Sequence, residues 1–171
     1  MPLHAGDYYA SSFGIKSNGT TLNTNAIQKA IDYISSEGGG KLMFKVGRYL
    51  TGTIQLKDNV TIDLGEGAVL VGSPNPYDYY SVAGTPGFIV AYQAKNIGIT
   101  GKGVIDGQGR EVANNFLGQI ALGFIDDQLS LGRPGGVRPN LILLRECEGV
   151  TLKNVNIRNS AAWTVYIDKC Q

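Results

Sequence analysis

The chain has 171 residues, enough for one domain with a core, and 43% of them are hydrophobic, which argues against disorder. Its 15 basic and 14 acidic side chains leave a net charge of +1 without long runs of one sign, so neither nucleic acid nor a membrane is an expected partner. Charged residues are scarce at 17% and glycine is abundant at 24 residues, which predicts a β-rich fold with tight turns.

The first predicted element is a helix of about three turns, which begins after residues 23–25 and ends at the triple glycine 38–40. Asn23 and its two neighbours are candidate caps for its start. One face of this helix is apolar, formed by Ala26, Ile27, Ala30, Ile31 and Ile34. Strand-like segments follow at 41–46 and 49–56, separated by a turn at Gly47.

A two-strand pattern then recurs in DNVTIDLGEGAVLVGS (58–73), KNIGITGKGVIDGQG (95–109) and EGVTLKNVNIRNS (148–160). Each copy has a first apolar pair, a polar or glycine step, and a second apolar pair. The first pairs are Val60/Ile62, Ile97/Ile99 and Val150/Leu152, and the second pairs are Val69/Val71, Val104/Ile105 and Val155/Ile157. Short units that cannot bury a face alone, stacked in series, predict a solenoid.

The two cysteines, Cys147 and Cys170, support this prediction because they are 23 residues apart and each follows an alternating strand. One coil of a β-solenoid takes roughly two dozen residues, so the cysteines are expected to stack as a buried pair. Neither has a neighbour that would lower its pKa, which argues against a reactive thiol. A disulfide between them is left open.

The repeats are unevenly spaced, since Asn59 and Asn96 are 37 residues apart whereas Asn96 and Gly149 are 53 apart. The surplus predicts loop insertions at about 74–87 and 110–139, which in solenoids often flank one binding face. We therefore expect one partial β-helix domain over 1–171. Its N-terminal segment, 1–40, holds the cap helix, and 41–171 forms the coils.

The segments YLTGTIQLKDNVTIDLGEGAVLVGS, NIGITGKGVIDGQG and RPNLILLRECEGVTLKNVNIRNSAAWTVY, in this order, resemble the N-terminal half of glycoside hydrolase family 28. These are the polygalacturonase-like enzymes of the pectin-lyase-like superfamily. FGIKSNGTTLNTNAIQKAI resembles the cap of pectin-active β-helices, so the resemblance covers about residues 13–171. It implies an all-β fold: a right-handed single-stranded parallel β-helix with an N-terminal capping α-helix, truncated at its C-terminal side.

The resemblance also implies inverting hydrolysis of α-linked galacturonic acid or a related pectic sugar, with no cofactor and no metal. One carboxylic acid protonates the leaving oxygen, and a carboxylate pair activates water on the opposite side. The family carries these groups in Asn-Thr-Asp and Asp-Asp motifs, followed by Gly-His-Gly and Arg-Ile-Lys. The first, third and fourth motifs are missing here, the only histidine is His4, and Asp126-Asp127 lies within the second insertion. No catalytic residue is therefore predicted in this chain, which is expected to be inactive alone.

Four residues are candidates for contact with a pectic sugar: Arg138, Tyr166, Asp168 and Tyr79. Arg138 can pair with a galacturonate carboxylate, or it can anchor the second insertion. Tyr166 and Asp168 alternate with apolar residues and so face outward on their strand, where they either contact sugar or form a solvated strand face. Tyr79 belongs to a tyrosine-rich loop whose rings can stack on a sugar or pin the loop.

Two further residues are predicted to be structural. Trp163 is interpreted as a core aromatic between coils rather than a cleft residue. Asp106 is interpreted as a turn former that accepts hydrogen bonds from backbone N–H groups.

Three functions stay open. The leading one is the N-terminal portion of a glycoside hydrolase that acts on pectic polysaccharide outside the cell or in the periplasm, although the first residues here lack the features of a signal peptide. The alternatives are a non-enzymatic polysaccharide-binding or tail-spike-like module, and a fragment of a calcium-dependent polysaccharide lyase. A β-helix cut across a coil exposes strand edges, so we expect self-association or a second chain at the C-terminal coil, where Val165, Ile167 and Cys170 are uncovered.

Overall fold

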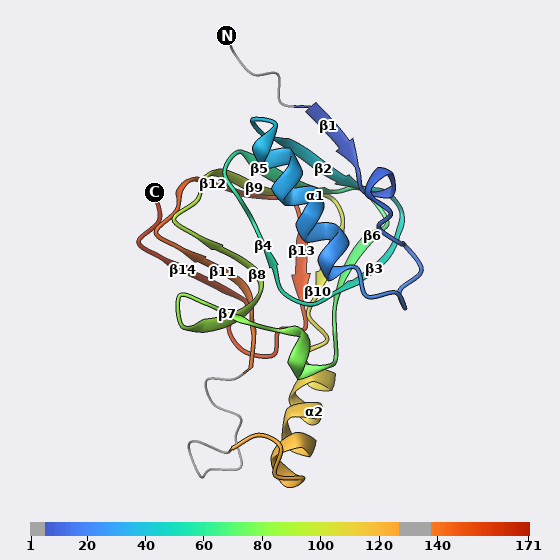
Figure 1. Ribbon diagram of the computed structural model, residues 1–171, viewed down its shortest axis with the longest axis vertical. Coiled ribbons are helices and arrows are strands. Elements are labelled where there is room, and N and C mark those ends of the chain that lie inside the picture. Colours follow the sequence, from blue (N-terminus) through green and yellow to red (C-terminus); the bar gives the residue numbers. More distant parts are fainter. Residues whose placement is uncertain (1–5, 127–137) are drawn as a thin grey trace.

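The computed structural model describes residues 6–126 and 138–171 and shows a stack of parallel strands wound into a β-helix (Figure 1). His4 and Asp127, which the sequence analysis singled out, lie outside the described residues. Within the described part of the chain, no helix is long and apolar enough to cross a membrane. The predicted parallel β-helix is thus confirmed.

Three parallel sheets make up the walls of the β-helix. Sheet A contains β1 (Gly6–Tyr9), β2 (Gly40–Phe44), β5 (Val60–Leu64), β9 (Lys95–Gly101) and β12 (Glu148–Lys153). Sheet B contains β3 (Gly47–Thr51), β6 (Ala68–Gly72), β10 (Val104–Asp106) and β13 (Asn156–Arg158). Sheet C contains β4 (Ile54–Gln55), β8 (Thr85–Tyr92), β11 (Asn140–Arg145) and β14 (Val165–Asp168).

Each passage of the chain through sheets A, B and C forms one coil. Coil 1 is β2–β3–β4, coil 2 is β5–β6–β8, coil 3 is β9–β10–β11, and coil 4 is β12–β13–β14. Strands in successive coils pair in register, so that equivalent side chains stack into ladders along the axis. In sheet C, for example, Ile89 pairs with Ile142, and Ile142 pairs with Val165. Strand alternation points all three side chains inward, where Ile89 and Ile142 belong to the common core.

The predicted superposition of the second strands is correct for Val69 with Val104 and for Ile105 with Ile157, but it was wrong for Val71. Leu70, rather than Val69 or Val71, stacks on Ile105 and therefore belongs to the inner ladder. Val71 pairs with Asp106 instead, yet it is buried as well. A valine that is buried on the outer side of a strand looks the same in sequence as one that faces the core, which explains the error.

The cap helix α1 (Thr24–Ser36) lies across the coils near β2 and buries the predicted apolar face except for Ala26, which is half-buried (Figure 1). Asn23 stands at the N-cap position of α1, as predicted, but its side chain does not bond to the first turn of the helix. Asn23 is buried and instead exchanges hydrogen bonds with the Lys16 backbone, at 2.8 and 2.9 Å. It thereby fixes the chain that enters the helix, while η1 (Ala10–Phe13) packs alongside.

Two long connections leave the stack of coils. The first, between β6 and β8, contains η2 (Pro76–Asp78) and β7 (Ser81–Val82), which pairs antiparallel with the start of β8. Because β8 begins at Thr85, residues 85–87 are strand rather than the predicted loop. The second, between β10 and β11, contains α2 (Gly109–Ala121), which projects from the lower edge of the β-helix in Figure 1.

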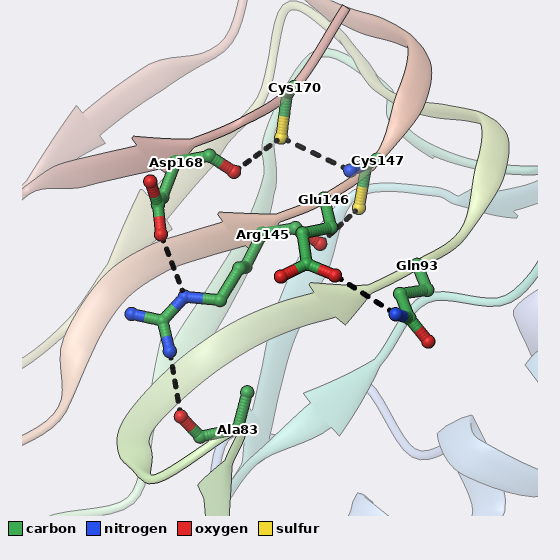
Figure 2. Close-up of polar contacts among 7 residues, drawn as sticks. All are labelled: Ala83, Gln93, Arg145, Glu146, Cys147, Asp168 and Cys170. Carbon is green, nitrogen blue, oxygen red and sulfur yellow. Dashed lines mark hydrogen bonds and ion pairs between the residues drawn. The ribbon is translucent and has the colours of Figure 1, made fainter.

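The cysteines stack one coil apart, as predicted, and both are free thiols (Figure 2). The Cys147 backbone N–H points to the sulfur of Cys170, with 3.4 Å between N and Sγ. Each cysteine follows a left-handed residue, Glu146 or Lys169, at which the chain turns from sheet C towards sheet A. Burial raises the pKa of the Cys147 thiol, which fits a packing role.

Coil 4 differs from the coils beneath it because its inward-facing residues are exposed at one end of the β-helix. Val165 and Ile167 are 36% and 54% exposed, as the sequence analysis expected for this layer. Cys170 is half-buried rather than fully uncovered. The core therefore extends from α1 to the inner face of coil 4.

Candidate functional site

A hollow of about 280 Å³ lies at the N-terminal ends of the sheet C strands. It is lined by Thr85, Pro86, Arg138, Asn140, Ala162, Trp163 and Tyr166. These residues come from three successive coils: the first two begin β8, the next two stand at the start of β11, and the last three belong to β14 and the turn before it. The register of the coils therefore brings together positions that are far apart in the sequence.

Trp163 shows how the turn before β14 is built and why its predicted core position was wrong. Its indole is 71% exposed at the hollow, whereas its backbone is tightly held. The buried Asn140 side chain accepts a hydrogen bond from the Trp163 N–H at 3.1 Å, and the Leu141 N–H donates to the Trp163 carbonyl at 2.9 Å. Ala161 takes the buried place in this turn, packed against Val112 of α2. The indole is consequently directed into solvent.

Arg138 and Tyr166, two of the four predicted binding residues, both line this hollow. Tyr166 is half-buried on the outward face of β14, as strand alternation predicted. Arg138 stands two residues before β11 and is also half-buried. An arginine, a tryptophan, a tyrosine and an asparagine therefore line one open space of about 280 Å³.

Asp168 is on the same outward face but does not line the hollow. Its carboxylate forms an ion pair with Arg145 of β11, with 3.1 Å between Oδ2 and Nε (Figure 2). Arg145 also donates from Nη1 to the Ala83 carbonyl at 2.7 Å, and its guanidinium carbon is 5.8 Å from the centre of the Tyr166 ring. Interactions with Tyr166 and, secondarily, Asp168 raise the pKa of Arg145 above its usual value despite some desolvation.

Arg145 is the residue that sequence reasoning missed. The available signal was the spacing of 23 residues between Arg145 and Asp168, which equals the spacing of the two cysteines and places opposite charges on adjacent coils. The third contact, to Ala83, could not be found this way, because it depends on how the β7–β8 hairpin folds over sheet C.

Tyr79, the fourth predicted binding residue, lies apart from the hollow. Its hydroxyl donates to the Ser73 carbonyl at 2.6 Å, and its ring packs edge-on against Phe88 with 6.4 Å between ring centres. Burial, together with the negative charge of Asp78, raises its pKa. The side chain therefore holds the first long connection against coil 2.

Asp106 has the predicted turn-forming role and two additional partners. Its carboxylate accepts hydrogen bonds from the Gln108 N–H at 3.2 Å, from the Asn159 amide at 3.0 Å and from the Arg158 guanidinium at 3.0 Å. Burial alone would raise the pKa of Asp106, but these hydrogen bonds outweigh it and lower the pKa. Asp106 thus ties the ends of coils 3 and 4 together.

No three His, Cys, Asp or Glu side chains gather as a metal site within residues 6–126 and 138–171. The side chains that line the hollow offer recognition by charge, stacking and hydrogen bonding. An exposed indole suits the apolar face of a sugar ring, and an arginine suits a carboxylate. The fold places the molecule in the class of parallel β-helix proteins, here with an open hollow beside sheet C.

Comparison with known families specifies this class further. Residues 39–171 match the sequence profile of glycosyl hydrolases family 28. The chain belongs to this family.

Among its relatives, the exo-poly-alpha-D-galacturonosidase of Dickeya chrysanthemi is 36% identical over 116 residues, which are 58% of this chain and 19% of that protein. A crystal structure from Parabacteroides merdae, provisionally described as a glycosyl hydrolase, superposes with a TM-score of 0.88 at 46% identity, covering 96% of this chain and 71% of that one. The family 28 exopolygalacturonase of Yersinia enterocolitica superposes with a TM-score of 0.82 at 28% identity, covering 97% and 37%. The chain thus spans about one fifth to one third of the curated relatives it matches.

Proposed function

We propose that this chain is the N-terminal portion of a glycoside hydrolase that cleaves α-galacturonosyl or related linkages in pectic polysaccharide. The observation that carries the proposal is the hollow, in which Arg138, Trp163 and Tyr166 face one open space on a family 28 scaffold. The names of the polygalacturonase relatives support the substrate class.

In this proposal the hollow is one part of a longer sugar-binding surface. Trp163 stacks on the apolar face of one sugar ring, and the Arg138 guanidinium pairs with the carboxylate of a galacturonate unit. Tyr166 supplies a hydroxyl to the sugar and Asn140 supplies its amide. The aspartates that protonate the leaving oxygen and activate water are supplied from outside this chain, which binds and positions the polymer but does not cleave it alone.

We further propose that the complete enzyme acts at a chain end. Two of the relatives are named for exo action. A structural observation also supports action at a chain end. Helix α2 packs through Val112 and Phe116 on Ala161, two residues before Trp163. Asn115 anchors α2 to the first long connection by donating to the Pro74 carbonyl at 2.7 Å. The two connections are therefore joined to each other beside the turn that carries Trp163.

The proposal includes a cellular setting and a protein partner. Pectic polysaccharide is an extracellular polymer, so an extracellular or periplasmic location fits the substrate. The exposed inner face of coil 4 and the outer edges of its strands fit a further layer of β-helix, which a second chain or a second copy can provide.

The single tryptophan gives a direct test of sugar binding, because Trp163 lines the hollow. Titration with the α-1,4-linked trimer of galacturonic acid should change its fluorescence with a dissociation constant of about 1 mM, since only part of the binding surface is present. The neutral galactose trimer should bind more weakly. The Arg138→Met variant should lose this preference, whereas Lys153→Met, at an exposed position of sheet A, should keep it.

Three outcomes would contradict the proposal. An unchanged fluorescence spectrum with both trimers would exclude the hollow as a sugar site. Binding about a thousandfold tighter would favour the alternative of a self-sufficient polysaccharide-binding module. Release of reducing ends from polygalacturonate by the purified chain alone would show that the catalytic groups lie within it.

A further inference from the structure

The tip of the β7–β8 hairpin is held in a strained backbone conformation. Its two turn residues, Ala83 and Gly84, have φ angles of 50° and 82°. Glycine adopts such angles freely, whereas a residue with a Cβ pays about 1–2 kcal/mol for the left-handed region. An alanine at this place therefore requires neighbouring contacts that hold the turn.

Arg145 supplies such a contact. Its Nη1 donates to the carbonyl of Ala83, the strained residue itself, at 2.7 Å (Figure 2). A hydrogen bond from a charged guanidinium is stronger than one between neutral groups. The hairpin of coil 2 is thus fastened to β11 of coil 3 across the outer face of sheet C.

The same guanidinium also reaches coil 4. Its Nε is 3.1 Å from the Asp168 carboxylate, and its carbon is 5.8 Å from the centre of the Tyr166 ring. Both side chains of the ion pair are partly shielded from water, at 23% and 34% exposure. One planar group therefore connects the hairpin tip to the strand that carries Tyr166.

These contacts bear on the hollow, because its opposite sides belong to the connected elements. The β7–β8 hairpin contributes Thr85 and Pro86, and β14 contributes Tyr166. We infer that Arg145 is a positioning residue for the hollow, which sets the separation between the hairpin and the Tyr166 ring while Arg138 makes the charged contact with the ligand. This inference rests on the proposed sugar-binding function.

The positioning role of Arg145 follows from its own surroundings. The positive charge of Arg145 is compensated by the adjacent Asp168 carboxylate, so the pair contributes little net attraction to an acidic ligand. Lysine cannot replace Arg145 fully, because an ammonium group lacks the planar fork that serves several partners at once. The role of Arg145 should therefore depend on its shape more than on its charge.

The first experiment measures affinity for the galacturonic acid trimer by Trp163 fluorescence at two salt concentrations. The double variant Arg145→Met/Asp168→Asn removes the ion pair without changing the net charge, and it should weaken binding about tenfold, the effect of one lost contact of about 1.4 kcal/mol. The change of its trimer affinity with salt concentration should equal that of the original chain. Arg138→Met should instead flatten the salt dependence, because it removes the charged contact.

The second experiment needs no ligand. Hydrogen exchange at the backbone amides of residues 81–85 should accelerate about tenfold in the double variant, because the contact between residue 145 and the Ala83 carbonyl no longer holds the hairpin closed. Lys153→Met, at an exposed position of sheet A, should leave this exchange unchanged. Arg145→Lys should give a trimer affinity and a hairpin exchange rate between those of the original chain and of the double variant. This single variant serves as the test if the double variant does not fold.

The outcomes separate the two proposals. If the original chain does not bind the trimer, the proposed function fails, and hairpin exchange still tests the positioning role. If the double variant binds the trimer normally, or if hairpin exchange is unchanged in both Arg145 variants, the positioning role is wrong. A flattened salt dependence in the double variant would show that Arg145 contacts the ligand itself.

Discussion

Coils 3 and 4 have nearly the same pattern of apolar residues but differ in what covers them. Leu144 in coil 3 is 1% exposed, whereas its register partner Ile167 in coil 4 is 54% exposed. The same contrast holds in sheet A, where Ile99 is buried and its partner Leu152 is exposed. Alternation along a strand therefore decides which way a side chain points, and burial additionally requires a layer above it.

The largest expected effect is on core stability and tests this contrast directly. Leu144→Ala should lower the free energy of unfolding by about 2–5 kcal/mol, because it opens a cavity between two layers. Ile167→Ala, at the register-matched position, should cost about 1 kcal/mol, because water already reaches the side chain. Urea unfolding of both variants measures the difference. Equal losses would show that coil 4 is as well covered as coil 3.

A second prediction concerns Asp106, which connects coil 3 to Arg158 of coil 4. Asp106→Asn should lower the unfolding free energy at pH 6 by about 1–3 kcal/mol, through the loss of charge-assisted hydrogen bonds. Because the folded protein lowers the pKa of Asp106, its stabilisation is present above the ordinary pKa of this carboxyl. It is lost as the pH falls through the lowered pKa.

The difference in unfolding free energy between the original chain and Asp106→Asn should therefore shrink as the pH falls below about 4. Urea unfolding at several pH values measures this difference. In an Arg158→Met background, the Asp106→Asn substitution should lower the unfolding free energy by less at pH 6, because one partner of the Asp106 carboxylate is already missing. A difference between the original chain and Asp106→Asn that is the same at pH 3 and pH 6 would contradict this account.

A third prediction uses the exposed layer of coil 4. Ile167→Lys should change stability by only about 0.5 kcal/mol, but it should reduce concentration-dependent self-association by placing a charge on the apolar end. The control is Val46→Lys, because Val46 is equally apolar and 74% exposed but lies outside coil 4. Sedimentation velocity over a range of concentrations measures association. If the original chain remains monomeric throughout, the exposed layer does not drive association.

The smallest effect is expected at Trp163, which separates an exposed site residue from a core residue. Trp163→Phe should leave the unfolding free energy within about 0.5 kcal/mol of the original, as is usual for surface substitutions. In the unaltered chain, acrylamide should quench the fluorescence readily. A loss of several kcal/mol would instead support the core position that the sequence suggested.

Most of the fold could be predicted from the sequence because its signals are local and repeated. The apolar face of α1, the glycines that end it and the alternation within each strand each depend on a few neighbouring residues. The cysteine spacing added the length of one coil. Errors arose where a residue had two possible partners, as with Asn23, whose side chain bonds to the Lys16 backbone instead of to the first turn of α1.

The site was only partly predictable. Arg138 and Tyr166 could be selected by residue type and alternation, and the structure places both at the hollow. Trp163 was misassigned because large aromatic residues are usually buried, and only the position of Ala161 against α2 shows that the buried place is already filled.

By itself, the sequence determined that this chain is a β-solenoid of the polygalacturonase-like type, with an inward face, an outward face and no family catalytic motif. The solenoid and its two faces follow from periodicity, which neighbouring residues define, whereas the polygalacturonase-like type follows from the resemblance of several segments to a known family. Only the tertiary structure decided that Arg145 links Ala83, Asp168 and Tyr166. The reason is physical: a coil brings together residues that are 23 to 62 positions apart, and the way in which a connection folds back onto the stack leaves no local trace in the sequence.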